Sequence, residues 1–172
     1  AGMAAYKAAQ TKNQDAILPL SPKLKSVALI GPNAANLPLD GHSSSAVIPS
    51  YSITPKQGLE TLLGADRVRY AKGCDINSTN RSLFAEAKRM ARDSEVVVFV
   101  GGLDNTVEGE GYFIKGDRLT GSVDLPGVQS ELINEIAAVN RNMILVVISG
   151  GPCAVNKVLA NVKGLFYACY PG

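Results

Sequence analysis

The sequence predicts an α/β fold in which a mostly parallel sheet carries helices on both faces, a three-layer α/β/α sandwich. Short apolar runs such as 95–100 lack polar alternation, which is typical of strands buried on both faces. These runs alternate along the chain with segments of helical periodicity. Several of them stop at glycine-rich turns, including 31–33 and 101–102, where such sheets place their functional loops.

The first half of the chain predicts two strands and two helices. Strands are expected at 26–30 and 68–71. The helix expected at 55–63 has Thr54 as N-cap, Pro55 at its first position and Gly64 at its end. A second helix is expected over 82–92. Its inward stripe consists of Leu83, Ala87, Met90 and Ala91.

The second half predicts three strands, at 95–100, 143–148 and 164–168. An amphipathic helix is expected over 126–140, and a short one over 154–159. The residues of the longer helix that should face inward are Val128, Leu132, Ile133, Ile136 and Ala137.

The division into domains follows from proline and glycine content. Residues 1–12 are alanine-rich and could form a short helix, whereas 13–25 contain Pro19 and Pro22 and indicate a linker. We therefore assign 1–25 to a linker remnant and 26–172 to the sandwich domain. The stretch 34–56 is rich in Ser, Pro and Gly and indicates a long surface loop.

Composition excludes several classes of partner. The 172 residues are 46% hydrophobic and 19% charged, with a net charge of +2 spread along the chain, so no nucleic-acid partner is expected. No apolar run approaches the roughly 20 residues that span a bilayer, so no membrane partner is expected. The N-terminus lacks the charged-then-apolar layout of a signal peptide.

Three cysteines, Cys74, Cys153 and Cys169, match no zinc or CxxC spacing, and neither a metal site nor a cofactor is expected. Buried thiols are the favoured interpretation, and one disulfide plus one remaining thiol is the alternative. Sequons begin at Asn77 and Asn80, and both would be usable if the protein is secreted.

Two glycine-containing turns argue against other functions. The turn 31–34 is not G-x-G-x-x-G, and Pro32 removes a backbone donor that a phosphate would need. A flavodoxin-like nucleotide or cofactor binder is therefore only a third hypothesis. The stretch 41–45 does not complete a G-x-S-x-G nucleophile elbow, and His42, the only histidine, has no triad layout around it.

The segment 101–127 carries the densest set of acidic residues and follows the most hydrophobic strand. A solvated acidic loop is one interpretation. The other is that it presents the carboxylic acid with which a glycosidase protonates a leaving oxygen, with glycines allowing close approach to a sugar. Its charged residues are Asp104, Glu108, Glu110, Lys115, Asp117, Arg118 and Asp124.

Several stretches, in order along nearly the whole chain, resemble the second domain of family 3 glycoside hydrolases. Thr54-Pro-Lys-Gln-Gly-Leu59 is similar to a "TPLEGL" helix start, and Asp117-Arg118 with Leu125-Pro-Gly-Val-Gln129 resembles a "DR…LPG-x-Q" signature. The other matching stretches are 18–20, 27–34, 68–74, 96–101, 149–152 and 170–172.

The resemblance implies a retaining exo-glycosidase in which a (β/α)₈ barrel supplies the nucleophilic aspartate and this domain supplies the acid/base glutamate. Gly109-Glu-Gly-Tyr112 matches the "GEGY" of β-glucosidases, and 102–110 resembles the "GLDNT-x-E-x-E" of β-xylosidase-like members. Both alignments favour Glu110, with Glu108 as runner-up. Tyr112 is expected to bind substrate, and Asp117 with Arg118 to form a structural loop pair.

The resemblance therefore predicts a fragment of a β-glycosidase that acts on a β-linked glucoside or xyloside together with the barrel domain. The isolated chain is expected to be inactive and the enzyme to be secreted. Departures from the family pattern are the polar stretch 10–13, His42 in place of glycine, and a chain that stops at Gly172, where the family continues. A non-catalytic carbohydrate- or protein-binding module is the alternative.

Overall fold

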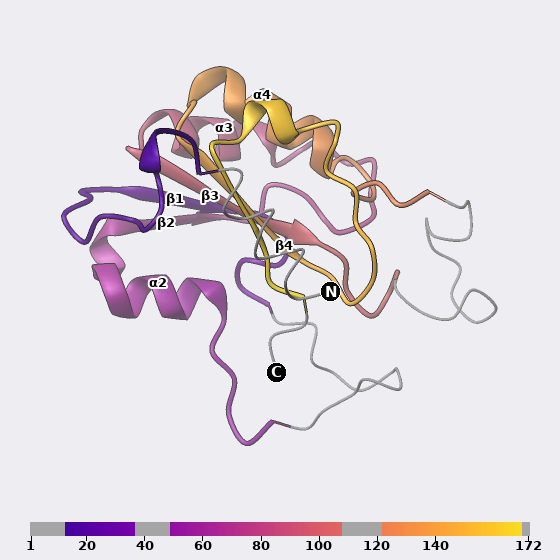
Figure 1. Ribbon diagram of the computed structural model, residues 1–172, viewed down its shortest axis with the longest axis horizontal. Helices are drawn as coiled ribbons and strands as arrows, with labels where there is room; N and C mark the ends of the chain where they lie inside the picture. Colours follow the sequence, from indigo (N-terminus) through magenta and orange to yellow (C-terminus); the bar gives the residue numbers. More distant parts are fainter. Residues whose placement is uncertain (1–12, 37–48, 108–121, 170–172) are drawn as a thin grey trace.

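The computed structural model describes residues 13–36, 49–107 and 122–169. Within them the chain forms a five-stranded parallel sheet of order β2-β1-β3-β4-β5 (Figure 1). The α/β class predicted from the sequence is confirmed. The strands are β1 (Val27–Ile30), β2 (Val68–Ala71), β3 (Val96–Gly102), β4 (Met143–Ile148) and β5 (Gly164–Tyr167).

Helices lie on both faces of this sheet, as Figure 1 shows. α3 (Phe84–Arg92) and α4 (Gln129–Val139) pack side by side on one face, and α2 (Pro55–Leu63) lies on the other. The sheet consequently separates two apolar clusters. Alternate residues of β1 contribute to each, with Ala28 and Ile30 on the α3–α4 side and Val27 and Leu29 on the α2 side.

Burial explains why β1 and β3 read as continuous apolar runs in the sequence. All four residues of β1 are 0% exposed, and every residue of β3 is buried. Both strands lie in the interior of the sheet, with neighbours on each side and helical layers above and below. A polar residue at any of these positions would lose its water without gaining a partner.

α2 begins and ends at the residues that the sequence predicts. The Thr54 side chain accepts from the Gln57 N–H at 3.2 Å, and the Gln57 side chain accepts from the Thr54 N–H at 2.9 Å, which completes a capping box. Pro55 occupies the first turn, and Gly64 ends the helix at φ 96°.

α3 differs from its prediction by two residues. It begins at Phe84, because Asn80 and Arg81 form turns with Ser82 and Phe84 just before it. Leu83 is 37% exposed, so its placement on the inward stripe was wrong, and Phe84, 4% exposed, is buried instead.

The helix predicted over 154–159 is also absent, and turns there lead into a 3-10 helix, η4 (Leu159–Asn161). Ala154 forms a parallel bridge with Asp124, and its N–H donates to the Val123 carbonyl at 2.6 Å. That pairing holds Ala154 in an extended conformation, which prevents a helix from starting there.

Residues 13–24 lie against the α2 side of the sheet. Ile17, Leu18, Leu20 and Leu24 pack on its apolar cluster. Asn13 forms an antiparallel bridge with Gly164, and the Gln14 N–H donates to the Lys163 carbonyl at 2.9 Å. The domain boundary at residue 25 stays a prediction. No helix within the described ranges is long and apolar enough to cross a membrane.

Candidate functional site

The strand order creates a switch point at the carboxyl ends of β1 and β3. From β1 the chain crosses to β2 on one side and then to β3 on the other. In open parallel sheets, the loops that leave such a point diverge and form a crevice for ligands. Gly31 to Asn33 follow β1 here, and the segment singled out in the sequence follows β3.

Two glycines give the chain the same sharp turn at the ends of both strands. Gly31 and Gly102 each have φ 125°, a conformation that other residues rarely adopt. A Cβ at Gly31 would lie 2.1 Å from the Val100 carbonyl oxygen, and one at Gly102 would lie 2.0 Å from that of Ile148. Both turns therefore press the backbone against the neighbouring strand.

The side chain of Gln129 holds the end of β3 from α4. It is 0% exposed, and its Oε1 accepts from the Gly102 N–H at 2.9 Å. Its Nε2 donates to the carbonyls of Gly102 and Ile76, both at 2.9 Å. One amide thus joins β3, the loop after β2 and the start of α4. Gln129 appeared in the sequence signature 125–129 without a predicted role.

The beginning of the acidic segment is held by a short turn. Asp104 Oδ1 accepts from the backbone N–H of Thr106 at 2.9 Å and from its Oγ1 at 2.5 Å. Val107 then inserts into the apolar cluster on the α3–α4 side, where it is 5% exposed. The chain from Gly102 to Val107 is therefore fixed at three successive points.

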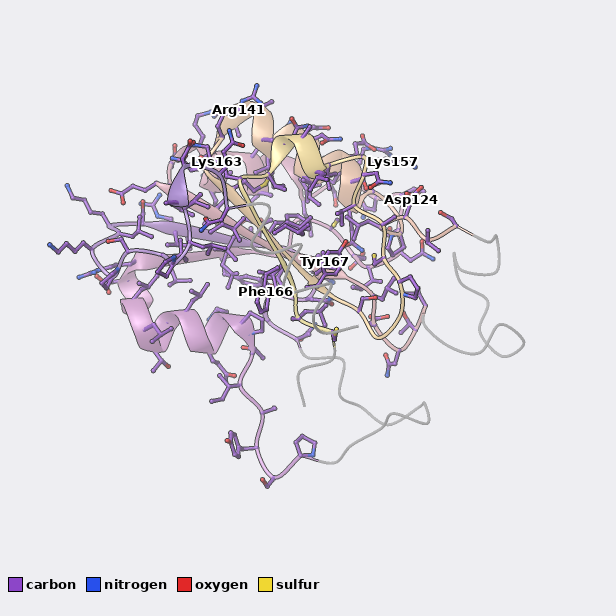
Figure 2. All side chains as sticks on the ribbon, viewed as in Figure 1. Asp124, Arg141, Lys157, Lys163, Phe166 and Tyr167 are labelled. Atoms are coloured by element: carbon purple, nitrogen blue, oxygen red, sulfur yellow. The ribbon has the colours of Figure 1, made fainter. Side chains whose placement is uncertain are left out.

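The end of the acidic segment is held as well. Asp124 pairs with Lys157 Nζ at 2.7 Å (Figure 2). The Asp124 backbone also forms a parallel bridge with Ala154. Leu125, the next residue, is 4% exposed and belongs to the same cluster as Val107. Both ends of the segment thus rest on one side of the sheet.

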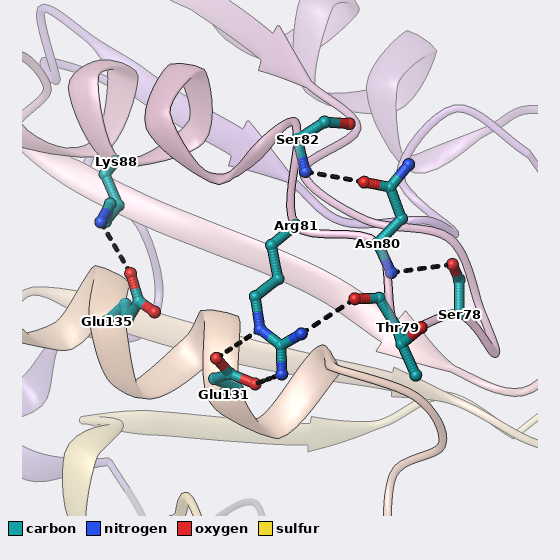
Figure 3. A network of polar contacts seen from close by, with 8 residues as sticks. All are labelled: Ser78, Thr79, Asn80, Arg81, Ser82, Lys88, Glu131 and Glu135. Carbon is teal, nitrogen blue, oxygen red and sulfur yellow. Dashed lines mark hydrogen bonds and ion pairs between the residues drawn. The ribbon is translucent and has the colours of Figure 1, made fainter.

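The loop 77–82 after β2 braces this region from the side. Arg81 makes a bidentate ion pair with Glu131 of α4, with both contacts at 2.7 Å, and also donates to the Thr79 carbonyl (Figure 3). Hydrogen bonding to Arg81 lowers the pKa of the Glu131 carboxyl. The Val128 N–H donates to the Ser78 carbonyl at 3.2 Å, so this loop touches the start of α4 directly.

The residues to which the sequence analysis gives a role lie outside the described residues: Glu110 and Glu108 for acid/base catalysis, Tyr112 for substrate binding, and Asp117 with Arg118 as a structural loop pair. His42, for which the sequence indicates no catalytic role, lies outside them as well. Of the acidic residues in 101–127, the structure describes Asp104 and Asp124. Both are engaged in local structure, the first with Thr106 and the second with Lys157.

All three cysteines are described, and none forms a disulfide. Cys74 and Cys153 are buried, as the favoured interpretation predicted, whereas Cys169 is exposed. Burial raises the pKa of the Cys74 thiol to about 12, and the nearby Asp75 carboxylate raises it further. Within the described part of the chain, no group of three or more His, Cys, Asp or Glu residues is placed to hold a metal ion.

A comparison with protein families decides the relationship. The model of the glycosyl hydrolase family 3 C-terminal domain matches residues 11–172. The chain belongs to this family. The match includes the sheet and the complete acidic segment, so the resemblance drawn from short motifs is confirmed.

Individual relatives agree with this assignment. The family 3 domain is 37% identical over 171 residues to a β-xylosidase from Formosa agariphila. It superposes with a TM-score of 0.74 and 31% identity on a family 3 exo-β-xylosidase solved with a xylobiose aziridine activity-based probe, over 99% of this chain. A family 3 β-glucosidase from Bifidobacterium adolescentis gives a TM-score of 0.76 at 29% identity, over 98% of this chain.

These relatives are much longer than the chain. It spans 22% of the Formosa β-xylosidase, 22% of the exo-β-xylosidase structure and 24% of the Bifidobacterium β-glucosidase.

Proposed function

We propose that this family 3 domain supplies the general acid/base of a retaining β-glycosidase, and that Glu110 is that residue, with Glu108 as runner-up. The observation that carries the proposal is the position of the acidic segment. Its beginning follows the carboxyl end of β3 at the switch point, and its two ends are fixed by Gln129, Asp104 and the Asp124–Lys157 pair.

Glu110 is chosen from the family motifs, and the two described carboxylates of the segment are engaged elsewhere. Asp104 Oδ1 is occupied by two hydrogen bonds from Thr106, and Asp124 is paired with Lys157 and anchors the segment's end. Removing either carboxylate would disturb the segment's fold. The glutamates 108 and 110 lie between these two fixed ends, flanked by glycines at 109 and 111.

In this proposal, hydrolysis of the glycosidic bond proceeds in two steps. A carboxylate from the barrel domain attacks the anomeric carbon, the bond to the leaving oxygen breaks, and the Glu110 carboxyl gives its proton to that oxygen. Water then attacks the anomeric carbon of the covalent intermediate, the bond to the barrel carboxylate breaks and frees that carboxylate, and the water gives a proton to the Glu110 carboxylate, which restores the acid. The two carboxyl groups must lie about 5–5.5 Å apart for this retaining course.

We propose a β-xyloside or β-glucoside as substrate, because the relatives are named β-xylosidases and β-glucosidases. In this proposal Tyr112 contacts the sugar, and Asp117 with Arg118 holds the shape of the segment. We extend the proposal to an extracellular enzyme. Detection of the protein only in the cell fraction of its source would refute that location.

The proposal is tested with Glu110→Gln and Glu108→Gln in the full-length enzyme. Glu110→Gln should lower kcat on an unactivated disaccharide by about 10²–10⁴-fold, because the leaving oxygen no longer receives a proton. Glu108→Gln should retain most activity. The reverse pattern would move the assignment to Glu108.

Full activity of both variants would favour a non-catalytic binding module. The 172-residue chain alone should show no turnover, because it lacks the second carboxylate of the pair, and measurable turnover would contradict the two-domain mechanism.

A further inference from the structure

The acidic segment leaves the sheet at Gly102 and Leu103, and the backbone N–H and C=O of both residues are hydrogen-bonded. The Gly102 N–H and C=O are both bonded to the Gln129 amide at 2.9 Å. The Leu103 N–H donates to the Ile148 carbonyl at 2.8 Å, and its carbonyl accepts from Asn33 Nδ2 at 3.1 Å. Two consecutive residues are thus held from α4, from β4 and from the turn after β1.

Gln129 is an unusual residue for its position in the core. It is fully buried, and it shares the inward face of α4 with Leu132, Ile133 and Ile136. A leucine at 129 would pack on this face without the cost of burying an amide. The amide fits because Gly101 has no side chain, since a Cβ there would lie 2.5 Å from Gln129 Oε1.

We infer that Gln129 is a positioning residue. It holds Gly102, where the acidic segment leaves the sheet, so that Glu110 reaches the leaving oxygen. This inference rests on the proposed function. The third hydrogen bond of the Gln129 amide is to the Ile76 carbonyl, in the loop after β2. Arg81 of the same loop pairs with Glu131 of α4. Gln129 therefore links Gly102 directly to α4 and to the loop after β2.

Position matters because a general acid works only within hydrogen-bond reach of the atom that it protonates. A displacement of about 1 Å can cost about 10²-fold in rate. Gln129→Leu leaves three buried backbone groups without partners, on Gly102 and Ile76, and they can regain partners only by shifting. The expected consequence is a displaced acid rather than a lost binding site.

The test compares two aryl glycosides in the full-length enzyme. Departure of a 2,4-dinitrophenolate needs little protonation, whereas departure of an unsubstituted phenol depends on it. For Gln129→Leu, kcat/KM should fall by about 10²-fold on the phenyl glycoside and by less than about threefold on the dinitrophenyl glycoside. An equal loss on both substrates would overturn the inference.

Asn140→Leu is the matched control. Asn140 ends α4 and donates to the carbonyls of Ala91 and Ser94 at 2.8 and 2.7 Å, at the opposite end of the sheet. Its removal costs two part-buried side-chain hydrogen bonds at the other end of α4 but leaves the hydrogen bonds of Gly102 intact. The ratio of the two kcat/KM values should stay at the wild-type value in this control, and a matching change there would overturn a role specific to Gln129.

Glu110→Gln separates the inference from the function beneath it. If Glu110→Gln shows the leaving-group contrast and Gln129→Leu does not, only the inference fails. If neither shows it, the proposed function fails first. If Gln129→Leu does not fold, Asn33→Ala takes its place in the test. This substitution removes the hydrogen bond from Asn33 Nδ2 to the Leu103 carbonyl. A smaller contrast of the same sign supports the clamp, and an unchanged ratio overturns it.

Discussion

Substituting Gly102 by alanine should destabilise the domain more than almost any other change of one methyl group. The backbone at Gly102 has φ 125°, and an added Cβ would lie 2.0 Å from the carbonyl oxygen of Ile148 and 3.0 Å from its nitrogen. These are backbone atoms of a central strand, so they cannot turn aside as a flexible side chain would. β3 and β4 must separate, or Gly102 must leave its conformation.

Two costs add up to the expected loss in the free energy of unfolding. Holding alanine at this φ costs about 1–3 kcal/mol. Forcing extra volume into a packed region costs about 1–3 kcal/mol more. The free energy of unfolding should therefore fall by about 2–6 kcal/mol, which for a domain of this size lowers Tm by roughly 5–20 °C.

Urea unfolding followed by circular dichroism measures this difference, and Gly58→Ala is the matched control. Gly58 lies within α2, and a Cβ there would meet nothing nearer than Ile53 Cγ2 at 4.0 Å. The same substitution should therefore stabilise the chain by about 0.5–1 kcal/mol at that site. A Gly102→Ala protein within about 0.5 kcal/mol of the parent would refute the tight approach of β3 to β4.

Further expectations follow from burial. Leu132→Ala, at a site that is 0% exposed, should cost about 2–5 kcal/mol in urea unfolding, whereas Leu62→Ala, at 78% exposure, should change stability by less than about 0.5 kcal/mol. Similar losses at both sites would contradict the position of the core. Iodoacetamide at pH 8 should alkylate the exposed Cys169 and spare Cys74, whose thiol stays protonated with a pKa of about 12, and mass mapping of the labelled peptides would show this. Because the pKa of Cys74 is higher in the folded state than its ordinary value near 9, the unfolded state loses its proton first, and stability should fall as pH rises above about 9, by at most about 1.4 kcal/mol per unit from this group. A flat stability profile between pH 9 and 11 would argue against that burial.

Local signals in the sequence were enough to predict several elements. α2 was predicted to the residue because its N-cap threonine, first-turn proline and terminal glycine all lie within eleven positions of one another. The five inward residues predicted for the helix over 126–140 are all buried, and their repeat at helical spacing over ten residues made them predictable. The helix itself, α4, begins only at Gln129, so Val128 precedes it.

Tertiary contacts overrode the pattern elsewhere. The stripe assigned to 82–92 began one residue early, because turns made by Asn80 and Arg81 delay the helix and rotate Phe84, rather than Leu83, into the core. Pairing of Ala154 with Asp124, thirty residues away, removed the helix predicted at 154–159. No local propensity reveals such a partner.

The site was predictable in part. Glycines after apolar strands marked the carboxyl edge of the sheet, and the acidic segment between two motifs marked the loop that carries the proposed chemistry. The clamp on Gly102 was not predictable. Gln129 forms hydrogen bonds to backbone atoms 27 and 53 residues away. Nearly all residue types carry the same backbone groups, so the sequence does not indicate such a partner.

Azide rescue of Glu110→Ala in the full-length enzyme tests the central claim most directly. With a dinitrophenyl glycoside the glycosyl-enzyme still forms, and the space left by the carboxyl admits azide, which needs no base to attack. The account predicts faster turnover with azide and a β-glycosyl azide product, because the anomeric centre is inverted twice. No acceleration, or an α-glycosyl azide, would contradict the role of Glu110 as acid/base.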